Sequence, residues 1–193
     1  MRIAFDIDEV ICDFCTPAVA AMRELHIADL PEDYRPTKFS FQEVLTPDQW
    51  STVFDHLMHQ ENFWLSLLGY ANNIEDLRDY IGRNGEQDIY FVTARHQSLG
   101  ASTVIQTQLW LAEHEIGALG MPVIVTEDKR SAMIENGIQF SLDDIPVNVR
   151  ACKSIPGHRA FLLDRSHNQE ATDLPRVYSV AEYLLEVEAA SVT

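Results

Sequence analysis

The sequence alternates short apolar runs with segments of helical length, and this alternation constrains the fold more than any other feature. Runs of strand length occur at 2–7, 88–93, 122–126, 138–142 and 159–164. Helical stretches follow the later runs at about 99–115, 128–136, 146–153 and 179–190. Strands that are apolar on both faces and joined by helix-length crossovers predict a parallel sheet covered on both sides. We therefore expect a doubly wound, Rossmann-like α/β fold.

A segment of different character interrupts this alternation after the first strand. Between about 28 and 50, prolines and aromatic residues are frequent and helical periodicity is weak. The pair Thr46-Pro47 predicts a helix start, because threonine caps a helix and proline suits its first position. We expect a mostly helical cap over residues 14–85, inserted into a catalytic α/β core formed by residues 1–13 and 86–193.

The charge balance and the length of the apolar runs exclude several classes of partner. With 30 acidic and 14 basic residues the formal net charge is −16, so the average surface repels nucleic-acid backbones and anionic membranes. No apolar run approaches the roughly 18 residues that cross a bilayer, and the acidic first segment does not resemble a secretory signal. We expect a cytoplasmic protein without stable nucleic-acid or membrane binding. An anionic substrate then needs a locally positive site or a bound cation.

Polar side chains gather where the predicted strands end. In an open parallel sheet the ligand crevice lies beyond the carboxyl ends of the strands. The residues at these ends are Asp6, Asp8, Thr93, Lys129, Asp143 and Asp144. Carboxylates that lie close together repel unless a cation or a proton separates them. Because magnesium prefers oxygen ligands, the sequence predicts a magnesium site at this edge of the sheet.

This set of side chains suits phosphoryl transfer. One carboxylate can attack phosphorus and form an aspartyl phosphate, which divides a difficult hydrolysis into two easier displacements. A second carboxyl two residues later can protonate the leaving oxygen and afterwards activate water. A threonine hydroxyl and a lysine ammonium can hold the remaining phosphate oxygens.

Four short motifs in this order resemble those of the haloacid dehalogenase superfamily. They are DIDEV, YFVTAR, TEDKR and SLDD, which begin at residues 6, 90, 126 and 141. The segments ENFWLSLLGYANNIEDLRDYI and FLLDRSHN extend the resemblance to the 5'(3')-deoxyribonucleotidases of the type C 5'-nucleotidase group. The resemblance implies a haloacid dehalogenase-like fold and a magnesium-dependent phosphatase.

The resemblance also implies a role for each motif residue. Asp6 is expected to be the nucleophile and a metal ligand, and Asp8 the general acid and base whose carbonyl binds the metal. Thr93 and Lys129 are expected to bind phosphate. Asp143 is expected to be the direct magnesium ligand, with Asp144 in the outer shell of the metal.

Two departures from the family pattern and one aromatic pair leave alternatives open. Glu9 stands where the family usually has glycine, and Arg95 lies in place of the Ser-Pro that often follows the threonine. Arg95 could add a phosphate or sugar contact or make an ion pair. Phe63 and Trp64 could pack in the core or, as the resemblance suggests, line the pocket against a nucleobase.

The leading hypothesis is therefore hydrolysis of (deoxy)nucleoside monophosphates to nucleoside and phosphate. The alternatives are a phosphatase for another small phosphorylated metabolite, a phosphatase for polynucleotide ends, and a non-catalytic nucleotide-binding protein. A signalling receiver domain also combines aspartates, a hydroxyl and a lysine, but the order of the motifs here opposes it. The expected partner is a small nucleotide substrate, and a homodimer stays open.

Overall fold

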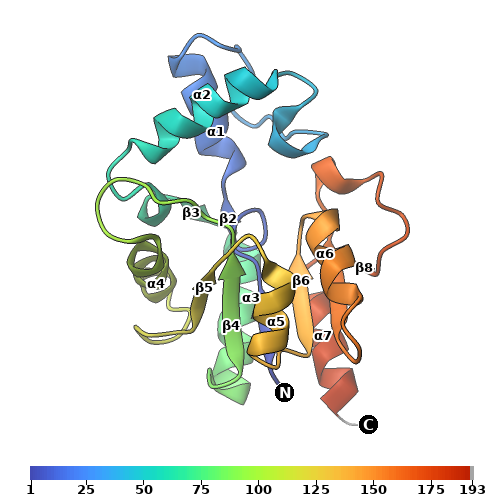
Figure 1. Cartoon of the computed structure of the whole chain (residues 1–193). Helices are drawn as coiled ribbons and strands as arrows, with labels where there is room; N and C mark the ends of the chain where they lie inside the picture. Colours follow the sequence, from blue (N-terminus) through green and yellow to red (C-terminus); the bar gives the residue numbers. More distant parts are fainter. Residues whose placement is uncertain (192–193) are drawn as a thin grey trace.

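The computed structural model describes residues 1–191 and contains a six-stranded parallel sheet (Figure 1). The strands follow the order β5-β4-β1-β6-β7-β8. Their bounds are β1 (Ile3–Phe5), β4 (Ile89–Thr93), β5 (Val123–Val125), β6 (Phe140–Asp143), β7 (Arg159–Leu163) and β8 (Arg176–Val177). The first strand in the chain lies near the middle of the sheet, between β4 and β6. This arrangement confirms the predicted doubly wound α/β fold.

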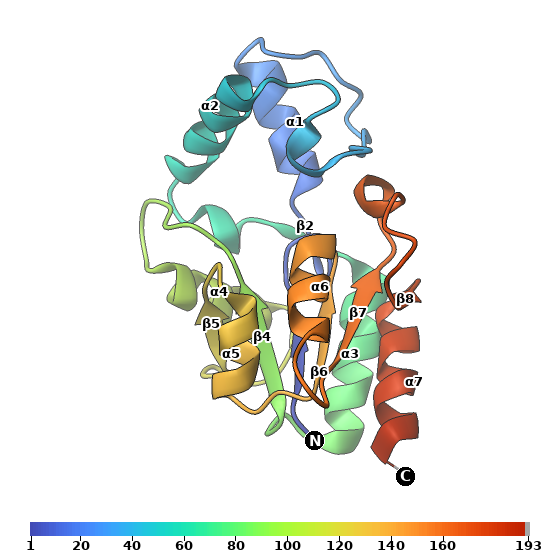
Figure 2. The ribbon, with the colours of Figure 1, turned by 45° about the vertical axis from the view of Figure 1, so that its right-hand side comes forward.

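Helices cover both faces of this sheet. They are α3 (Ala71–Asn84), α4 (Thr103–Glu113), α5 (Lys129–Glu135), α6 (Pro146–Lys153) and α7 (Val180–Ser191). Figure 2 shows α5 and α6 on one face and α3 and α7 on the other, and each of these pairs is in contact. The helices begin and end within a few residues of the stretches predicted from periodicity.

The strand β1 shows why two apolar layers are needed. Successive side chains of a strand point to opposite faces. Ile3 and Phe5 belong to one buried cluster, which includes Leu77 of α3, whereas Ala4 belongs to a second cluster with Val149 of α6. Every residue of β1 is therefore buried, and this explains the uninterrupted apolar run in the sequence.

A small helical cap lies above the carboxyl ends of the strands. It contains α1 (Cys15–Glu24) and α2 (Pro47–Met58), which pack on each other, and a short 3-10 turn at Phe39–Phe41 (Figure 1). Thr46 and Gln49 form a reciprocal capping box at the start of α2, so the helix start predicted from Thr46-Pro47 is confirmed.

Two short pieces of chain connect the cap with the core. The strand β2 (Cys12–Asp13) pairs antiparallel with β3 (Leu68–Gly69), and a 3-10 turn at Phe63–Leu65 precedes β3. The helix α3 follows directly and packs against α7 in the core. We propose on this ground that the cap ends near residue 70, whereas the wider division into 1–13, 14–85 and 86–193 stays a prediction.

Within residues 1–191, no helix combines the length and the apolar character that crossing a bilayer requires.

Candidate active site

The order of the strands brings the predicted catalytic residues together. Asp6 follows β1, Thr93 is the last residue of β4, and Asp143 is the last residue of β6. Because β4 and β6 flank β1 on either side, these three side chains lie at one edge of the sheet. This edge is where the strand order reverses, the position that ligands occupy in open α/β sheets.

Lys129 neutralises part of the charge of the carboxylates. Its Nζ lies 2.9 Å from Asp6 Oδ2 and 2.7 Å from Asp143 Oδ2, and only 3% of its side chain is exposed. Burial alone would lower the pKa of Lys129, but the two carboxylates outweigh burial and raise it above the ordinary value. The lysine therefore carries a positive charge at neutral pH, as a phosphate-binding residue requires.

Asp6, Asp143 and Asp144 form a buried carboxylate cluster. One oxygen from each residue lies within 4.8 Å of the others, the one group of this kind among residues 1–191. Burial raises the pKa of Asp6, although Lys129 opposes this effect. Three carboxylates against one nearby ammonium leave a surplus of negative charge, and all their donor atoms are oxygens. The donor set therefore fits a hard divalent cation such as magnesium.

Asp143 and Asp144 differ in their other contacts. Asp143 accepts hydrogen bonds from the backbone N–H of Ile145 at 2.8 Å and from Lys129 at 2.7 Å. Asp144 Oδ2 lies 2.9 Å from Nε2 of His167. Burial alone would lower the pKa of His167, but the neighbouring Asp144 carboxylate outweighs burial and raises it. Both aspartates reach the cluster, and the division into a direct and an outer-shell ligand stays a prediction.

Asp8 is not part of this cluster and forms an ion pair with Arg95. The Arg95 Nε lies 3.0 Å from Asp8 Oδ2, and its Nη2 lies 2.9 Å from Asp8 Oδ1. Thr93 Oγ1 is 3.4 Å from Asp8 Oδ2. Asp8 stays 24% exposed, whereas the Arg95 side chain is fully buried. Arg95 thus forms an ion pair with Asp8, and its contact with substrate stays a prediction.

Glu9 adopts a left-handed backbone conformation with φ of 57°. Its Oε1 accepts hydrogen bonds from the backbone N–H groups of Phe14 and Cys15, both at 2.9 Å, at the start of α1. Its Oε2 accepts a hydrogen bond from the Tyr70 hydroxyl at 2.8 Å. Burial raises the pKa of Glu9, and the Tyr70 hydrogen bond opposes this effect. Glu9 thus links the loop after β1 to the first helix of the cap and to the start of α3.

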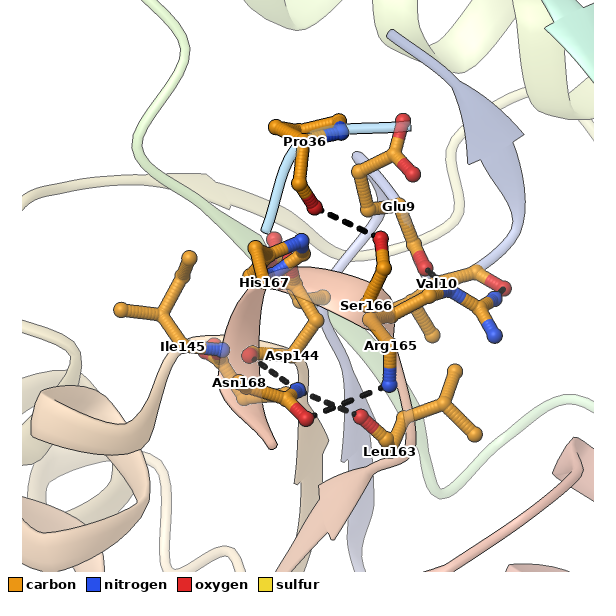
Figure 3. A network of polar contacts seen from close by, with 12 residues as sticks. Glu9, Val10, Pro36, Asp144, Ile145, Leu163, Arg165, Ser166, His167 and Asn168 are labelled. Atoms are coloured by element: carbon orange, nitrogen blue, oxygen red, sulfur yellow. Dashed lines mark hydrogen bonds and ion pairs between the residues drawn. The ribbon is translucent and has the colours of Figure 1, made fainter. Parts of the chain in front are cut away.

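A loop near the end of the chain closes the other side of the site (Figure 3). Arg165 donates from Nε to the backbone oxygen of Glu9 at 2.5 Å, and Ser166 donates from Oγ to the backbone oxygen of Pro36 at 2.7 Å. Asn168 donates to the backbone oxygen of Asp144 at 2.8 Å. The loop therefore contacts the core and the cap together. The sequence assigns no role to Ser166 and Asn168. Two signals point to this loop: the position of Arg165 at a strand end, and the resemblance of FLLDRSHN to the family.

A cavity of about 700 Å³ lies between the sheet edge and the cap. Its polar floor includes Asp6, Asp8, Thr93, Lys129 and Asp144. Its aromatic wall consists of Phe14, Phe39, Phe41, Trp50, Phe54 and Trp64. This combination of a charged floor with aromatic rings above it suits a small substrate that carries a phosphate on a flat, apolar group.

The aromatic pair Phe63 and Trp64 is divided between two environments. Trp64 lines the cavity, and its Nε1 donates to the backbone oxygen of His96 at 2.7 Å. Phe63 is 1% exposed and is not among the residues that line the cavity. The pocket alternative of the sequence analysis thus remains available for Trp64, and Phe63 packs in the core.

The comparisons with known proteins agree with this geometry. Among curated proteins, none matches this chain. One similar solved structure is a haloacid dehalogenase family hydrolase from Deinococcus radiodurans with bound phosphate and sodium. Its sequence is 13% identical and the TM-score is 0.60. The match covers 98% of this chain and 96% of the Deinococcus chain. A haloacid dehalogenase-like hydrolase from Streptococcus pneumoniae is 11% identical with a TM-score of 0.58, covering 96% and 97%. At these identities the likeness concerns the fold.

The family comparison reaches further than the structural likeness. Residues 1–191 match the model of the family described as 5' nucleotidase, deoxy (pyrimidine), cytosolic type C protein. The match includes all four motifs and the cap. The chain therefore belongs to this family of cytosolic type C 5'-nucleotidases and is a phosphoric monoester hydrolase with a haloacid dehalogenase fold.

Proposed function

We propose that this enzyme hydrolyses (deoxy)nucleoside monophosphates to nucleoside and phosphate, with magnesium, through an aspartyl phosphate on Asp6. One observation carries the proposal. Asp6 lies 2.9 Å from the Lys129 ammonium on the floor of a cavity whose opposite wall is aromatic. A phosphate on this floor would place an attached nucleobase among the rings, where base stacking contributes roughly 1–3 kcal/mol.

In the first step an Asp6 carboxylate oxygen attacks phosphorus. The new bond joins Asp6 to phosphorus, and the bond from phosphorus to the nucleoside oxygen breaks. The carboxyl group of Asp8 gives its proton to that leaving oxygen, so the nucleoside departs as a neutral alcohol. Lys129 and Thr93 hold the other phosphate oxygens and stabilise the charge that develops on them.

In the second step the same groups hydrolyse the aspartyl phosphate. The Asp8 carboxylate takes a proton from water while the water oxygen attacks phosphorus. The bond between phosphorus and Asp6 then breaks, which releases phosphate and restores the free carboxylate. Asp8 therefore ends the cycle with the proton that it needs for the next first step.

The carboxylate cluster is the place for magnesium in this proposal. Asp6, the backbone carbonyl of Asp8 and Asp143 would hold the ion, with Asp144 in its outer shell. Carboxylate oxygens of Asp6, Asp143 and Asp144 already lie within 4.8 Å of one another. A bound magnesium ion would neutralise charge on the phosphate and on these carboxylates. The fit rests on the oxygen donors and on the surplus of negative charge at the site.

The size of the cavity and the charge of the chain favour small substrates. The cap leaves a cavity of about 700 Å³, and the net charge of −16 repels a polynucleotide backbone. These features oppose the alternative of a phosphatase for polynucleotide ends. The aromatic wall favours a nucleotide over a metabolite without a ring. We propose a cytosolic location in accord with the family description, and a homodimer stays a prediction.

A panel of monophosphates tests this function. Phosphate release would be measured with magnesium for 5'- and 3'-nucleotides, with ribose or deoxyribose, and for sugar phosphates and a 5'-phosphorylated oligonucleotide. We expect the mononucleotides to have the highest kcat/KM. The Asp6→Asn variant should lose turnover on every substrate, because an amide is a poor nucleophile. Normal turnover by this variant, or a preference for the oligonucleotide, would contradict the proposal.

A further inference from the structure

Arg95 has an environment that is unusual for an arginine next to a phosphate site. Its side chain is fully buried, and it lies two residues beyond Thr93, on the floor of the cavity. A buried guanidinium is stable only when its charge is paired and its N–H groups are hydrogen-bonded. The pKa of Arg95 is raised: burial alone would lower it, but the Asp8 carboxylate outweighs burial. Arg95 is therefore a permanent positive charge enclosed in the active site.

Each nitrogen of the guanidinium already has a polar partner. Nε and Nη2 contact the two oxygens of Asp8 at 3.0 and 2.9 Å. Nη1 donates to Thr107 Oγ1 at 3.0 Å, and Nη2 also contacts Cys12 Sγ at 3.2 Å. The guanidinium carbon lies 4.8 Å from the centre of the Trp64 ring. These contacts engage every nitrogen of the guanidinium and direct its N–H groups to Asp8, Thr107 and Cys12.

The contact with Asp8 has the geometry that fixes a carboxylate. Two parallel N–H groups from a rigid plane meet both oxygens, so the carboxylate cannot rotate about its last bond without losing one contact. A lysine cannot reproduce this arrangement, because its ammonium is a point charge on a flexible stem. The lone pairs of Asp8 that face the cavity stay available, in accord with its 24% exposure.

We infer that Arg95 is a positioning residue, which holds the Asp8 carboxyl in the orientation for proton transfer to the leaving oxygen. The inference rests on the proposed function and assigns Arg95 no contact with substrate. It also connects Asp8 with the aromatic wall, because the Trp64 ring that lines the cavity packs on the same guanidinium. A displacement of about 1 Å at a catalytic group such as Asp8 lowers the rate roughly 10²-fold.

Leaving groups of different basicity separate positioning from a general structural role. A nucleoside oxygen needs a proton as it leaves, whereas 4-nitrophenolate leaves without one. The value of kcat/KM includes binding and transfer of the phosphoryl group to Asp6 and excludes the later hydrolysis of the aspartyl phosphate. The ratio of kcat/KM for a nucleotide to kcat/KM for 4-nitrophenyl phosphate therefore falls when proton transfer from Asp8 is impaired. The Asp8→Asn background separates this loss from a change in substrate binding.

The variants Arg95→Met and Arg95→Lys would be compared with the wild type and with Asp8→Asn. We expect Arg95→Met to lower kcat/KM for the nucleotide roughly 10²-fold and to lower it much less for 4-nitrophenyl phosphate. Arg95→Lys should shift the ratio in the same direction and by less, because it keeps the charge without the two-pronged contact. In the Asp8→Asn background, Arg95→Met should leave the ratio unchanged, since the group that it positions is gone.

Thr107→Val serves as the matched control. It removes the partner of Nη1 and leaves the two contacts with Asp8, so it should lower the melting temperature without changing the ratio. If Arg95→Met does not fold in a thermal melt, the ratio for Arg95→Lys decides. Suppose that Asp8→Asn lowers kcat/KM more for the nucleotide than for 4-nitrophenyl phosphate, but the folded Arg95 variants lose kcat/KM equally on both. This result would overturn the inference about Arg95 and leave the proposed function intact. If Asp8→Asn lowers kcat/KM equally on both substrates, the proposed role of Asp8 as the general acid is itself contradicted.

Discussion

Glu9 shows how one side chain can stabilise a backbone conformation that it does not favour. A residue with a Cβ atom in the left-handed region costs roughly 1–2 kcal/mol relative to glycine. The Glu9 carboxylate offsets this cost, because it accepts two N–H groups at the start of α1 and the hydroxyl of Tyr70. Where glycine would adopt this backbone conformation without strain, Glu9 adopts it because its side chain forms hydrogen bonds between core and cap.

Two substitutions at Glu9 separate these effects. Glu9→Ala loses the carboxylate contacts and keeps the strain, whereas Glu9→Gly loses the contacts and removes the strain. We expect both variants to be less stable than the wild type, and the alanine variant to be less stable than the glycine variant by about 1–2 kcal/mol. Chemical denaturation of the three proteins measures this order. Equal stability of the two variants would show that the left-handed backbone at Glu9 carries no strain.

The buried environment of His158 predicts that the stability of the protein depends on pH, independently of catalysis. Its Nδ1 lies 2.9 Å from the backbone oxygen of Ile138, and its Nε2 lies 2.8 Å from the hydroxyl of Ser141. Burial lowers the pKa of His158, and the hydrogen bond with Ile138 opposes this effect. As the pH falls through the ordinary histidine value, the unfolded chain binds a proton that the folded protein does not, so stability decreases.

The variant His158→Gln tests this dependence. Glutamine keeps a polar side chain but does not titrate near neutral pH. Melting temperatures would be measured from about pH 7.5 to about pH 5.5, a range that contains the ordinary histidine pKa of about 6.5. The wild type should lose more of its melting temperature across this range than the variant. A parallel decrease in both proteins would assign the effect to other groups.

At the scale of elements, the cap helix α2 supplies aromatic rings to the cavity in which we propose that the substrate binds. It presents Trp50 and Phe54 to the cavity, with their ring centres 6.0 Å apart. Phe54 also meets the His96 ring edge-on at 5.2 Å. The capping box formed by Thr46 and Gln49 defines the first turn of this helix and hence the direction of both rings.

Truncation of one ring on α2 should affect nucleotides selectively. We expect Phe54→Ala to lower kcat/KM for a nucleoside monophosphate about tenfold to a hundredfold, as the loss of roughly 1–3 kcal/mol of stacking requires. Glycerol phosphate, which has no ring, should be affected little. Steady-state kinetics on both substrates measure the difference, and equal losses would remove the aromatic wall from substrate recognition.

Phe63→Ala is the matched control for that experiment. Phe63 is buried and does not line the cavity. Its truncation should lower the free energy of unfolding by about 3–5 kcal/mol, as is typical for a core phenylalanine. A folded Phe63→Ala protein should lose activity on both substrates alike. Selective loss on nucleotides would instead place Phe63 in the binding site.

The long elements could be predicted from the sequence, and the short ones could not. Five of the six strands of the large sheet carry apolar runs. Four of them, β1, β4, β6 and β7, are largely buried, and the edge strand β5 is half-buried. The sixth strand, β8, and the strands β2 and β3 have two residues each, too few for a periodic pattern. The helix α3 lies in the segment predicted as a mostly helical cap, and its sequence pattern contains no information on whether its apolar face packs in the cap or in the core.

The same division applies to the site. The residues at the strand ends could be placed together because the carboxyl ends of parallel strands lie at the same edge of the sheet. The pairing of Arg95 with Asp8, across 87 residues, and of His167 with Asp144 depends on how loops fold above that edge. In the sequence, each member of these two pairs looks like an ordinary charged or polar residue, so no pattern in the sequence predicts which residues pair.

At the scale of the whole molecule, the proposed function implies that negative charge makes the enzyme dependent on a divalent cation. The chain has a net charge of −16, and three buried carboxylates meet where an anionic substrate must bind. We expect a chelator to abolish phosphate release and magnesium to restore it. Magnesium alone should also raise the melting temperature, because a ligand that binds only the folded state stabilises it.

The variant Asp143→Asn provides the control for the metal experiment. It should weaken the effect of magnesium on the melting temperature, since one of the carboxylates in the cluster is lost. Calorimetric titration with magnesium would compare the affinities of the two proteins. Full activity of the wild type in excess chelator, or an unchanged magnesium affinity in Asp143→Asn, would contradict the proposed cation site.

The hydrogen bond between Ser166 and Pro36 contributes to how firmly the cap is held on the core. The cap is joined to the core by the chain on one side, and on the other side this bond connects the two. A neutral hydrogen bond contributes only about 0.5–1.5 kcal/mol to stability. Opening this contact would therefore cost little free energy, and the cap would then be attached on that side through the chain alone.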